Sequence, residues 1–112
     1  MKLVKALIKH EQLEGVRDSL DKLGITGITV KDVKGSGQQR GYTESYRGAK
    51  ATIHFRPKLE IETVIQDHQV EKVIEIILAN ARTGEIGDGK IFVIPVEETI
   101  RIRTGESGPS AV

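Results

Sequence analysis

Apolar and polar positions alternate along two early stretches of the chain, residues 2–9 and residues 25–35. Alternation with period two predicts β-strands, and the second stretch is also rich in β-branched side chains. Between them, apolar residues recur at helical spacing, and Gly24 follows as a stop signal; the apolar positions are Leu13, Val16, Leu20 and Leu23. The first third of the chain therefore predicts a strand, a helix and a strand.

The alternating pattern resumes over residues 51–66, where Pro57 predicts an edge or a bend because proline has no N–H to donate. Asp67 is a candidate cap for a helix over residues 68–82, whose apolar positions cover more than one stripe and predict deeper coverage than in the first helix. Residues 90–96 predict a short buried strand, and Ile100–Arg103 predicts a brief extended piece. The tail, residues 105–112, is expected to be flexible.

An internal repeat relates the two halves. Residues 6–16 align without gaps on residues 63–73, so that Gln12 meets Gln69 and Val16 meets Val73. Two strand–helix–strand units predict one α+β domain over residues 1–112, a ferredoxin-like βαββαβ sandwich with both helices on one face of an antiparallel sheet. Neighbouring apolar residues, such as Ile91 and Phe92, predict that self-association buries the other face.

A long polar stretch, Gly35 to Phe55, separates the halves. From Ser36 to Thr52 it contains no aliphatic residue larger than alanine. Segments of this length in a compact domain are usually functional or disordered. Our hypothesis is that the remaining residues present this loop and that ligands control its shape.

Composition excludes several functions. The chain has 112 residues with 17 basic and 16 acidic side chains, a balance that argues against general nucleic-acid binding. It has no cysteine, which excludes disulfides and thiol chemistry. The first residues do not read as a secretory signal, and no apolar run is long enough to span a bilayer. We therefore expect a cytoplasmic protein.

The strongest chemical motif is TGEIGDGK, residues 83–90. Its three glycines can present backbone amides to an anion, and Lys90 adds a charge. It is no Walker A loop, because the spacing differs and a strand follows. A plain glycine-rich turn explains the glycines equally well. Arg101 and Arg103 favour the anion site, because two residues apart on an extended segment they would point the same way; a solvated charged edge is the alternative.

Other motifs are weak. GSGQQRG, residues 35–41, does not open a helix and so fails as a dinucleotide fingerprint. Lys58 could bind a carboxylate or lie along the surface. The histidines lack the spacing of metal ligands, so no structural metal is expected. No nucleophile–base pair stands out, so we expect no enzyme.

The motifs GSGQQRG, TESYRGA, RPKLEIE, ARTGEIGDGKIFV and EETIRIRTGE together closely resemble the PII family of signal-transduction proteins, the nitrogen regulatory proteins P-II. The resemblance runs without gaps from Met1 to about Ser107. It implies a homotrimer with three nucleotide sites in the clefts between neighbours. It also identifies residues 37–55 as the T-loop, which docks onto target proteins.

The resemblance implies that ATP and ADP compete for each cleft. Arg101 and Arg103 are expected on the same subunit as the GDGK segment they join, and Thr29 is expected to reach the adenine from across the interface. The implied nucleotide-binding positions are Thr29, Gly35, Gln39, Glu62, Val64, Gly87, Asp88, Gly89, Lys90, Arg101 and Arg103.

With ATP and Mg²⁺ bound, family members bind 2-oxoglutarate. Gln39 would give its side-chain oxygen to Mg²⁺, and Lys58 would pair with the distal carboxylate. Coordination by Gln39 would pull the loop base into one conformation, which ADP would not do. The implied positions for 2-oxoglutarate are Gly37, Gln39, Gly41, Lys58 and Gly87.

The chain also departs from the family pattern. Ala51 stands where uridylylated members have tyrosine, and Ala49 stands where a phosphorylated serine occurs in cyanobacterial members. Gln38 replaces the usual arginine, which removes one phosphate contact, and Ser36 replaces a common phenylalanine. The partner-binding positions implied at the loop tip are Tyr46, Arg47 and Gly48.

The resemblance thus implies a sensor of ATP, ADP and 2-oxoglutarate that signals through the T-loop without uridylylation. Its target would be an ammonium transporter, a metabolic enzyme or a bicarbonate transporter, and a transporter would recruit it to the membrane. The alternatives are a regulator of carbon or bicarbonate metabolism with altered ligand preference, a nucleotide-hydrolysing enzyme on the same fold, and a structural trimer with a vestigial site.

Overall fold

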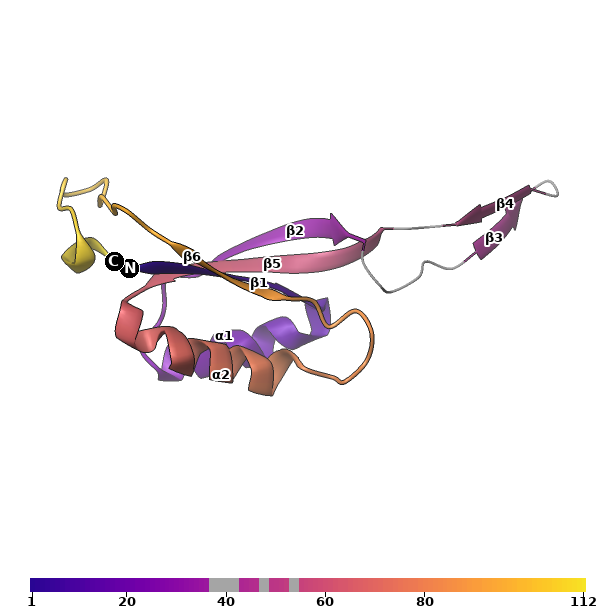
Figure 1. Ribbon diagram of the computed structural model, residues 1–112, viewed down its shortest axis with the longest axis horizontal. Coiled ribbons are helices and arrows are strands. Elements are labelled where there is room, and N and C mark those ends of the chain that lie inside the picture. The colour runs from indigo at the N-terminus through magenta and orange to yellow at the C-terminus, as the bar shows by residue number, and fades with distance from the viewer. Residues whose placement is uncertain (37–42, 47–48, 53–54) are drawn as a thin grey trace.

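A computed structural model describes residues 1–36, 43–46, 49–52 and 55–112 of the chain (Figure 1). Short 3₁₀ turns at His10–Gln12, Asp67–Gln69 and Pro109–Ala111 accompany the main elements. The strands and helices, in chain order, are β1 (Lys2–Ile8), α1 (Leu13–Lys22), β2 (Thr29–Gly35), β3 (Thr43–Tyr46), β4 (Ala49–Thr52), β5 (Arg56–Ile65), α2 (Val70–Ala81) and β6 (Ile91–Pro95).

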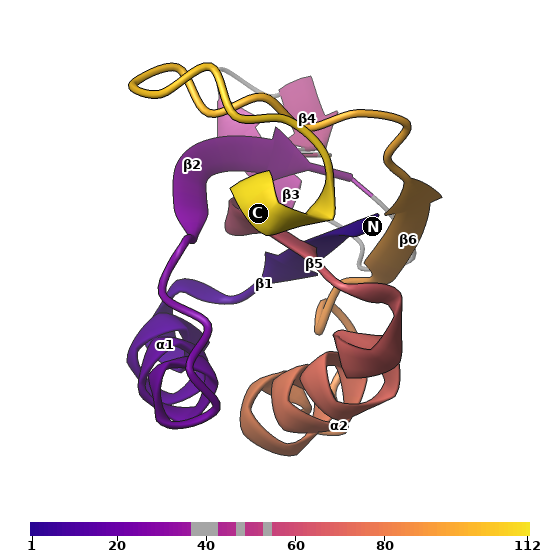
Figure 2. The same cartoon turned by 90° about the vertical axis from the view of Figure 1, so that its left-hand side faces the viewer.

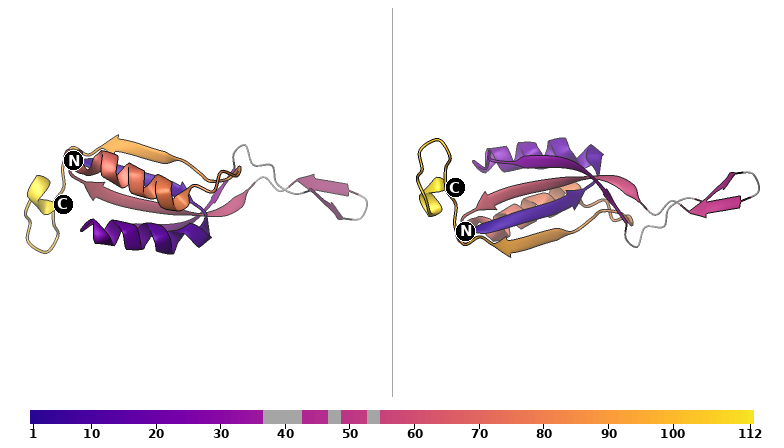
Figure 3. Two further views of the ribbon diagram at one scale, coloured as in Figure 1. Left: turned by 90° about the horizontal axis from the view of Figure 1, so that it is seen from below. Right: turned by 90° about the horizontal axis from the view of Figure 1, so that it is seen from above.

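The main sheet has the strand order β2–β5–β1–β6, and all neighbouring strands are antiparallel. Both helices lie side by side on one face of this sheet, which leaves the other face open (Figures 2 and 3). This arrangement confirms the predicted α+β, ferredoxin-like βαββαβ architecture.

The core lies between the sheet and the helices because alternate strand residues point to the same side. Each fully buried aliphatic side chain contributes about 1.5–3 kcal/mol relative to an exposed one. The core residues are Val4, Ala6 and Ile8 of β1, Leu59, Ile61 and Ile65 of β5, Val16 and Leu20 of α1, Ile25, and Val73, Ile77 and Ala81 of α2.

The predicted repeat is visible in the element boundaries. The strands end at Ile8 and Ile65, and the helices begin at Leu13 and Val70. One prediction at this boundary is wrong: Gln66, not Asp67, caps the turn before α2. Gln66 and Gln69 exchange side-chain-to-backbone hydrogen bonds, whereas Asp67 pairs with the Met1 amino group at 2.9 Å.

Pro57 lies in β5 opposite Lys34 of β2, beyond the point where β1 ends opposite Leu59. It therefore has a neighbour on one side only, as the edge prediction required. Beyond this point the β3–β4 hairpin extends away from the sheet, in a molecule of 60 × 27 × 20 Å (Figure 1).

The segment after β6 differs from the prediction. Ile100 forms an isolated bridge with Ser107, and residues 102–104 form a turn rather than an extended strand. Gly105 closes this turn with φ of +72°, and its N–H donates to Arg101 O at 2.7 Å. The tail, whose flexibility stays a prediction, contains the turn Pro109–Ala111, in which Ala111 is buried and Pro109 O accepts a hydrogen bond from Gln66 Nε2 at 2.7 Å.

Several apolar side chains remain exposed in the single chain. Phe92 and Ile94, on the open face of β6, are 43% and 40% exposed. Leu78 on α2 is 39% exposed and lines a groove of about 420 Å³ beside β6. α2 nevertheless buries Val73, Ile77 and Ala81, whereas α1 buries only Val16 and Leu20, so α2 is more deeply covered than α1, as its apolar pattern predicted.

Candidate functional site

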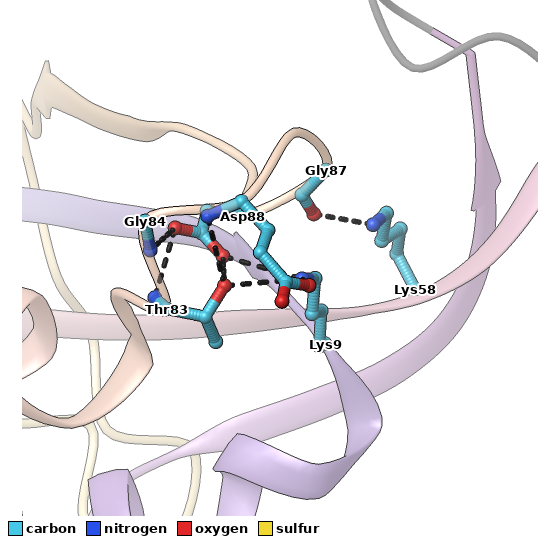
Figure 4. A network of polar contacts seen from close by, with 7 residues as sticks. Lys9, Lys58, Thr83, Gly84, Gly87 and Asp88 are labelled. Carbon is cyan, nitrogen blue, oxygen red and sulfur yellow. Dashed lines mark hydrogen bonds and ion pairs between the residues drawn. The ribbon is translucent and has the colours of Figure 1, made fainter.

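The glycine-rich loop, residues 83–90, connects α2 to β6 at the end of the sheet from which the β3–β4 hairpin extends (Figure 1). Its last residue is fixed to β1, because Leu7 N–H donates to Lys90 O at 2.9 Å. Figure 4 shows that Lys58 of β5 and Lys9, which follows β1, point toward this loop. Two lysines, one in β5 and one directly after β1, thus converge on the glycine-rich loop.

Gly89 is required by the packing of the loop against β1. Its φ is +92°, and a Cβ at this position would lie 1.8 Å from Leu7 O. Gly84 and Gly87 also have positive φ values, of 85° and 101°. The loop therefore adopts a backbone conformation that residues with side chains rarely adopt.

Asp88 holds the loop together from within. Its carboxylate accepts hydrogen bonds from the Thr83 hydroxyl and from the Thr83 and Gly84 amides, both at 2.9 Å. The Thr83 hydroxyl is the main reason that the pKa of Asp88 is lowered to about 2. The Asp88 carboxylate faces into the loop, so we interpret Asp88 as positioning the loop.

Sequence reasoning missed Lys9 and Thr83. Lys9 Nζ lies 3.2 Å from Thr83 Oγ1, 3.4 Å from Asp88 and 3.6 Å from Glu85. The presence of Thr83 and Gly84 shortly before Asp88 could have indicated a turn in which the Asp88 side chain accepts hydrogen bonds from nearby backbone amides. No pattern near Lys9 in the sequence could have indicated its contact with Thr83, because 74 positions separate the two residues.

Lys58 and Gly87 come together, as the resemblance implied for both. Lys58 Nζ donates to Gly87 O (Figure 4). Burial lowers the pKa of Lys58, and the charge of Lys9 lowers it further, while Asp88 and Glu11 act in the opposite direction. An anion bound here would stabilise the charged ammonium, so this end of the sheet favours carboxylate or phosphate ligands.

Other implied residues lie away from the glycine-rich loop, with Glu62 opposite Lys5 at the middle of β1. Thr29 and Glu62 are cross-strand partners near the end of β2 that is remote from the glycine-rich loop. The Glu62 carboxylate lies 3.2 Å from Lys31 Nζ and 3.5 Å from Lys5 Nζ. A hydrogen bond from Lys31 is the main cause of the lowered pKa of Glu62.

Arg101 and Arg103 follow β6 at the end of the sheet that is remote from the glycine-rich loop. β6 runs antiparallel to β1, so the chain leaves the loop at Lys90 and reaches the start of β1 by Val96, whose N–H donates to Met1 O at 3.2 Å. The seven residues of β1 span roughly 20 Å. The prediction that both arginines join the GDGK segment within one subunit is therefore wrong, because β6 carries the chain to the opposite end of the sheet before it reaches them; Figure 1 shows the course of β6.

Some predicted positions fall outside the described residues: Gly37, Gln38, Gln39, Gly41, Arg47 and Gly48. Tyr46 is the last residue of β3 and directly precedes residues 47–48, which lie outside the described residues. Within the described ranges, no group of three or more His, Cys, Asp or Glu residues could hold a metal ion. In the same ranges, no helix is long and apolar enough to cross a membrane.

Comparison with known proteins identifies the family. The family model "Nitrogen regulatory protein P-II" matches residues 1–106. Proteins named nitrogen regulatory protein P-II are 54% identical in Azospirillum brasilense, 53% in Pasteurella multocida and 52% in Microchaete diplosiphon. Each alignment covers 100% of both chains. The chain therefore belongs to the P-II family of nitrogen regulatory proteins, which are signalling proteins rather than enzymes.

Proposed function

We propose that this chain is a trimeric PII-type sensor that binds ATP or ADP in clefts between neighbouring subunits. The observation that supports this most is the separation of the implied phosphate ligands. Lys90 and the glycine-rich loop lie at one end of the sheet, and Arg101 and Arg103 follow β6 at the other. A second copy can bring the two ends together, and the exposed Phe92 and Ile94 on the open face favour such an association.

In this proposal each end supplies a different part of the site. Gly87 and Gly89 offer backbone amides to the phosphates and Lys90 offers its charge, with Gly35 beside them. The neighbouring subunit contributes the guanidiniums of Arg101 and Arg103 to the phosphates. Thr29, Glu62 and Val64 contact the adenine.

The same loop would bind 2-oxoglutarate when ATP is present. Lys58 pairs with the distal carboxylate, because its ammonium is partly buried and already lies at the Gly87 carbonyl. The Gln39 side-chain oxygen is a hard donor of the kind that Mg²⁺ prefers. A bound Mg²⁺ would neutralise phosphate charge and join the nucleotide to 2-oxoglutarate.

Signalling follows from differential contacts at the loop base. β2 ends at Gly35, directly before the T-loop, so a ligand held there favours one loop conformation over another. Ala51 and Ala49 lack the hydroxyl groups that covalent modification needs. Occupancy alone would then control docking of Tyr46, Arg47 and Gly48 onto a transporter or a metabolic enzyme.

Isothermal titration calorimetry tests the proposal. We expect ATP and ADP to bind the wild-type trimer, and 2-oxoglutarate to bind only with ATP and Mg²⁺. Lys58→Ala should abolish 2-oxoglutarate binding and leave ADP binding intact. Lys22→Ala, on the exposed face of α1, is the charge-matched control. Absence of ATP and ADP binding at millimolar concentrations would contradict the proposal.

A further inference from the structure

We propose that Glu106 is an internal anion that occupies Arg101 until a nucleotide phosphate replaces it, so that nucleotide binding releases the C-terminal tail. The tail comprises residues 105–112. The inference rests on the proposed function, in which Arg101 binds phosphate. The inference assigns Glu106 a role in setting nucleotide affinity, and it makes the tail a second segment, besides the T-loop, that responds to nucleotide binding.

The contacts of Arg101 are those that a phosphate would need. Its Nη1 lies 2.9 Å from Glu106 Oε2, and its Nη2 donates to Ser110 O at 3.3 Å. Two donors of one guanidinium are the usual means of binding a phosphate or a carboxylate. A phosphate can engage this fork only after these tail oxygens leave.

The competing carboxylate is held close by the fold of the tail. Arg101 N–H donates to Glu106 O at 2.8 Å, and Gly108 N–H lies 2.9 Å from both Thr99 O and Glu98 Oε1. Gly108 adopts a φ of +84°, which allows the chain to return toward β6. Because Glu106 is tethered five residues from Arg101, its effective concentration at the guanidinium is high.

The ion pair is nevertheless accessible to a ligand. The Arg101 and Glu106 side chains are 38% and 40% exposed. Exposed pairs of this kind are weak, so a polyphosphate with several charges can replace the carboxylate. The tail therefore lowers nucleotide affinity without preventing binding.

Arg103 provides a contrast within the same turn. Its side chain is exposed and makes no hydrogen bond or ion pair with the described part of the chain. A phosphate can thus meet Arg103 first and compete for Arg101 afterwards. This order gives the tail two states, bound to Arg101 or released.

Release of the tail would also break contacts that the tail makes away from Arg101. Gln66, which caps the turn before α2, donates through Nε2 to Pro109 O, and Ala111 is buried. Figure 1 places the tail at the end of the molecule opposite the β3–β4 hairpin. Nucleotide occupancy would then change both ends of the subunit.

The variant Glu106→Gln removes the charge and nearly preserves the shape of the side chain. Measured by calorimetry, we expect it to bind ATP and ADP about two- to fivefold more tightly than wild type, the range that an exposed ion pair allows. Glu97→Gln makes the same change of charge on a nearby exposed residue without a contact in the described part of the chain, and should bind like wild type. In an Arg101→Ala background, Glu106→Gln should have no effect.

Hydrogen exchange provides a second measurement. The amides of Gly105, Gly108 and Ala111 donate within the tail and to Thr99 and Arg101, so ATP should accelerate their exchange. Affinity that is unchanged or weaker in Glu106→Gln, or slower tail exchange with ATP, overturns the inference while leaving nucleotide sensing intact. If neither wild type nor variant binds nucleotide, the proposed function fails and the inference fails with it.

Discussion

At the residue scale, the conformation of the glycine-rich loop depends on Gly89, which has no side chain, and on the carboxylate of Asp88. Gly89 lies against the Leu7 carbonyl with no room for a Cβ, and Asp88 bonds the loop from inside. Neither role requires contact with a ligand. Both fix where the Gly87 and Gly89 amides and Lys90 lie, so changes here should affect folding and binding together.

Replacing Gly89 by alanine should be more harmful than replacing Gly84. Both have positive φ, which costs a residue with a Cβ about 1–2 kcal/mol. Only at Gly89 would the Cβ also meet backbone, at 1.8 Å from Leu7 O, which should add roughly 1–3 kcal/mol of overpacking. Urea unfolding of both variants measures this difference, and equal losses would show that the loop does not pack on β1 as described.

Asp88 predicts a dependence of stability on acid. Its pKa is about 2 in the folded chain and 3.8 for the free group, so the unfolded chain binds more protons between these values. The stabilisation is present above pH 3.8 and is lost as the pH falls through about 2. We therefore expect Asp88→Asn to be less stable than wild type at pH 7, and the difference to shrink below pH 3.8.

Unfolding curves over this pH range measure the effect. Asp21→Asn, an exposed residue of α1 without a side-chain contact in the described part of the chain, is the matched control. A wild-type advantage over Asp88→Asn that persists unchanged at pH 2 would exclude the carboxylate as its source.

At the element scale, the sequence predicted the strands and helices whose buried faces follow from the spacing of apolar residues. Val4, Ala6 and Ile8 alternate with partly exposed residues, and the same period in β5 buries Leu59, Ile61 and Ile65. The repeat then fixed both helix starts. Ile100–Arg103 was predicted wrongly because its alternation is strand-like, whereas Gly105 reverses the chain. That reversal depends on contacts with Glu106 and Thr99, which local pattern does not report.

Part of the candidate site was equally predictable. TGEIGDGK indicated close approach of the backbone, whereas Lys58 was grouped with Gly87 only through the family resemblance. Lys9 was not, because it reaches the loop only through the pairing of β1 with β6. Asp67 was predicted as the cap because a carboxylate is a common cap, whereas the Gln66–Gln69 exchange depends on the three-dimensional shape of the turn before α2.

The two halves of the repeat allow a matched test of that cap. Gln69 Oε1 accepts from Gln66 N–H at 2.9 Å, whereas the equivalent turn at His10–Gln12 has no side-chain cap. Gln69→Ala should therefore lower the free energy of unfolding by about 0.5–2 kcal/mol. Gln12→Ala should cost much less. Thermal unfolding of both distinguishes the cap from a general loss of glutamine, which would affect the two variants equally.

At the scale of the whole molecule, one chain carries the two proposed sets of phosphate ligands at opposite ends of its sheet. Lys90 and Lys58 lie at one end, and Arg101 lies beyond the start of β1 at the other. The open face between them carries ion pairs of Lys5 and Lys31 with Glu60 and Glu62, flanked by exposed apolar residues. In a closed ring two different surfaces of each copy meet, and the proposed function requires that one cleft join the two ends from neighbouring subunits.

Mixing two inactive variants tests this arrangement. Trimers made only of Lys90→Ala chains, or only of Arg101→Ala chains, lack one phosphate ligand in every cleft and should bind ATP weakly. In a mixed trimer, one cleft joins an intact Lys90 from one variant to an intact Arg101 from the other. Unfolding and refolding the two variants together at equal amounts should restore wild-type affinity at about one site in four, if subunits assemble at random. Calorimetry measures this fraction, and a site contained within one chain would restore none, since every chain carries one of the two substitutions.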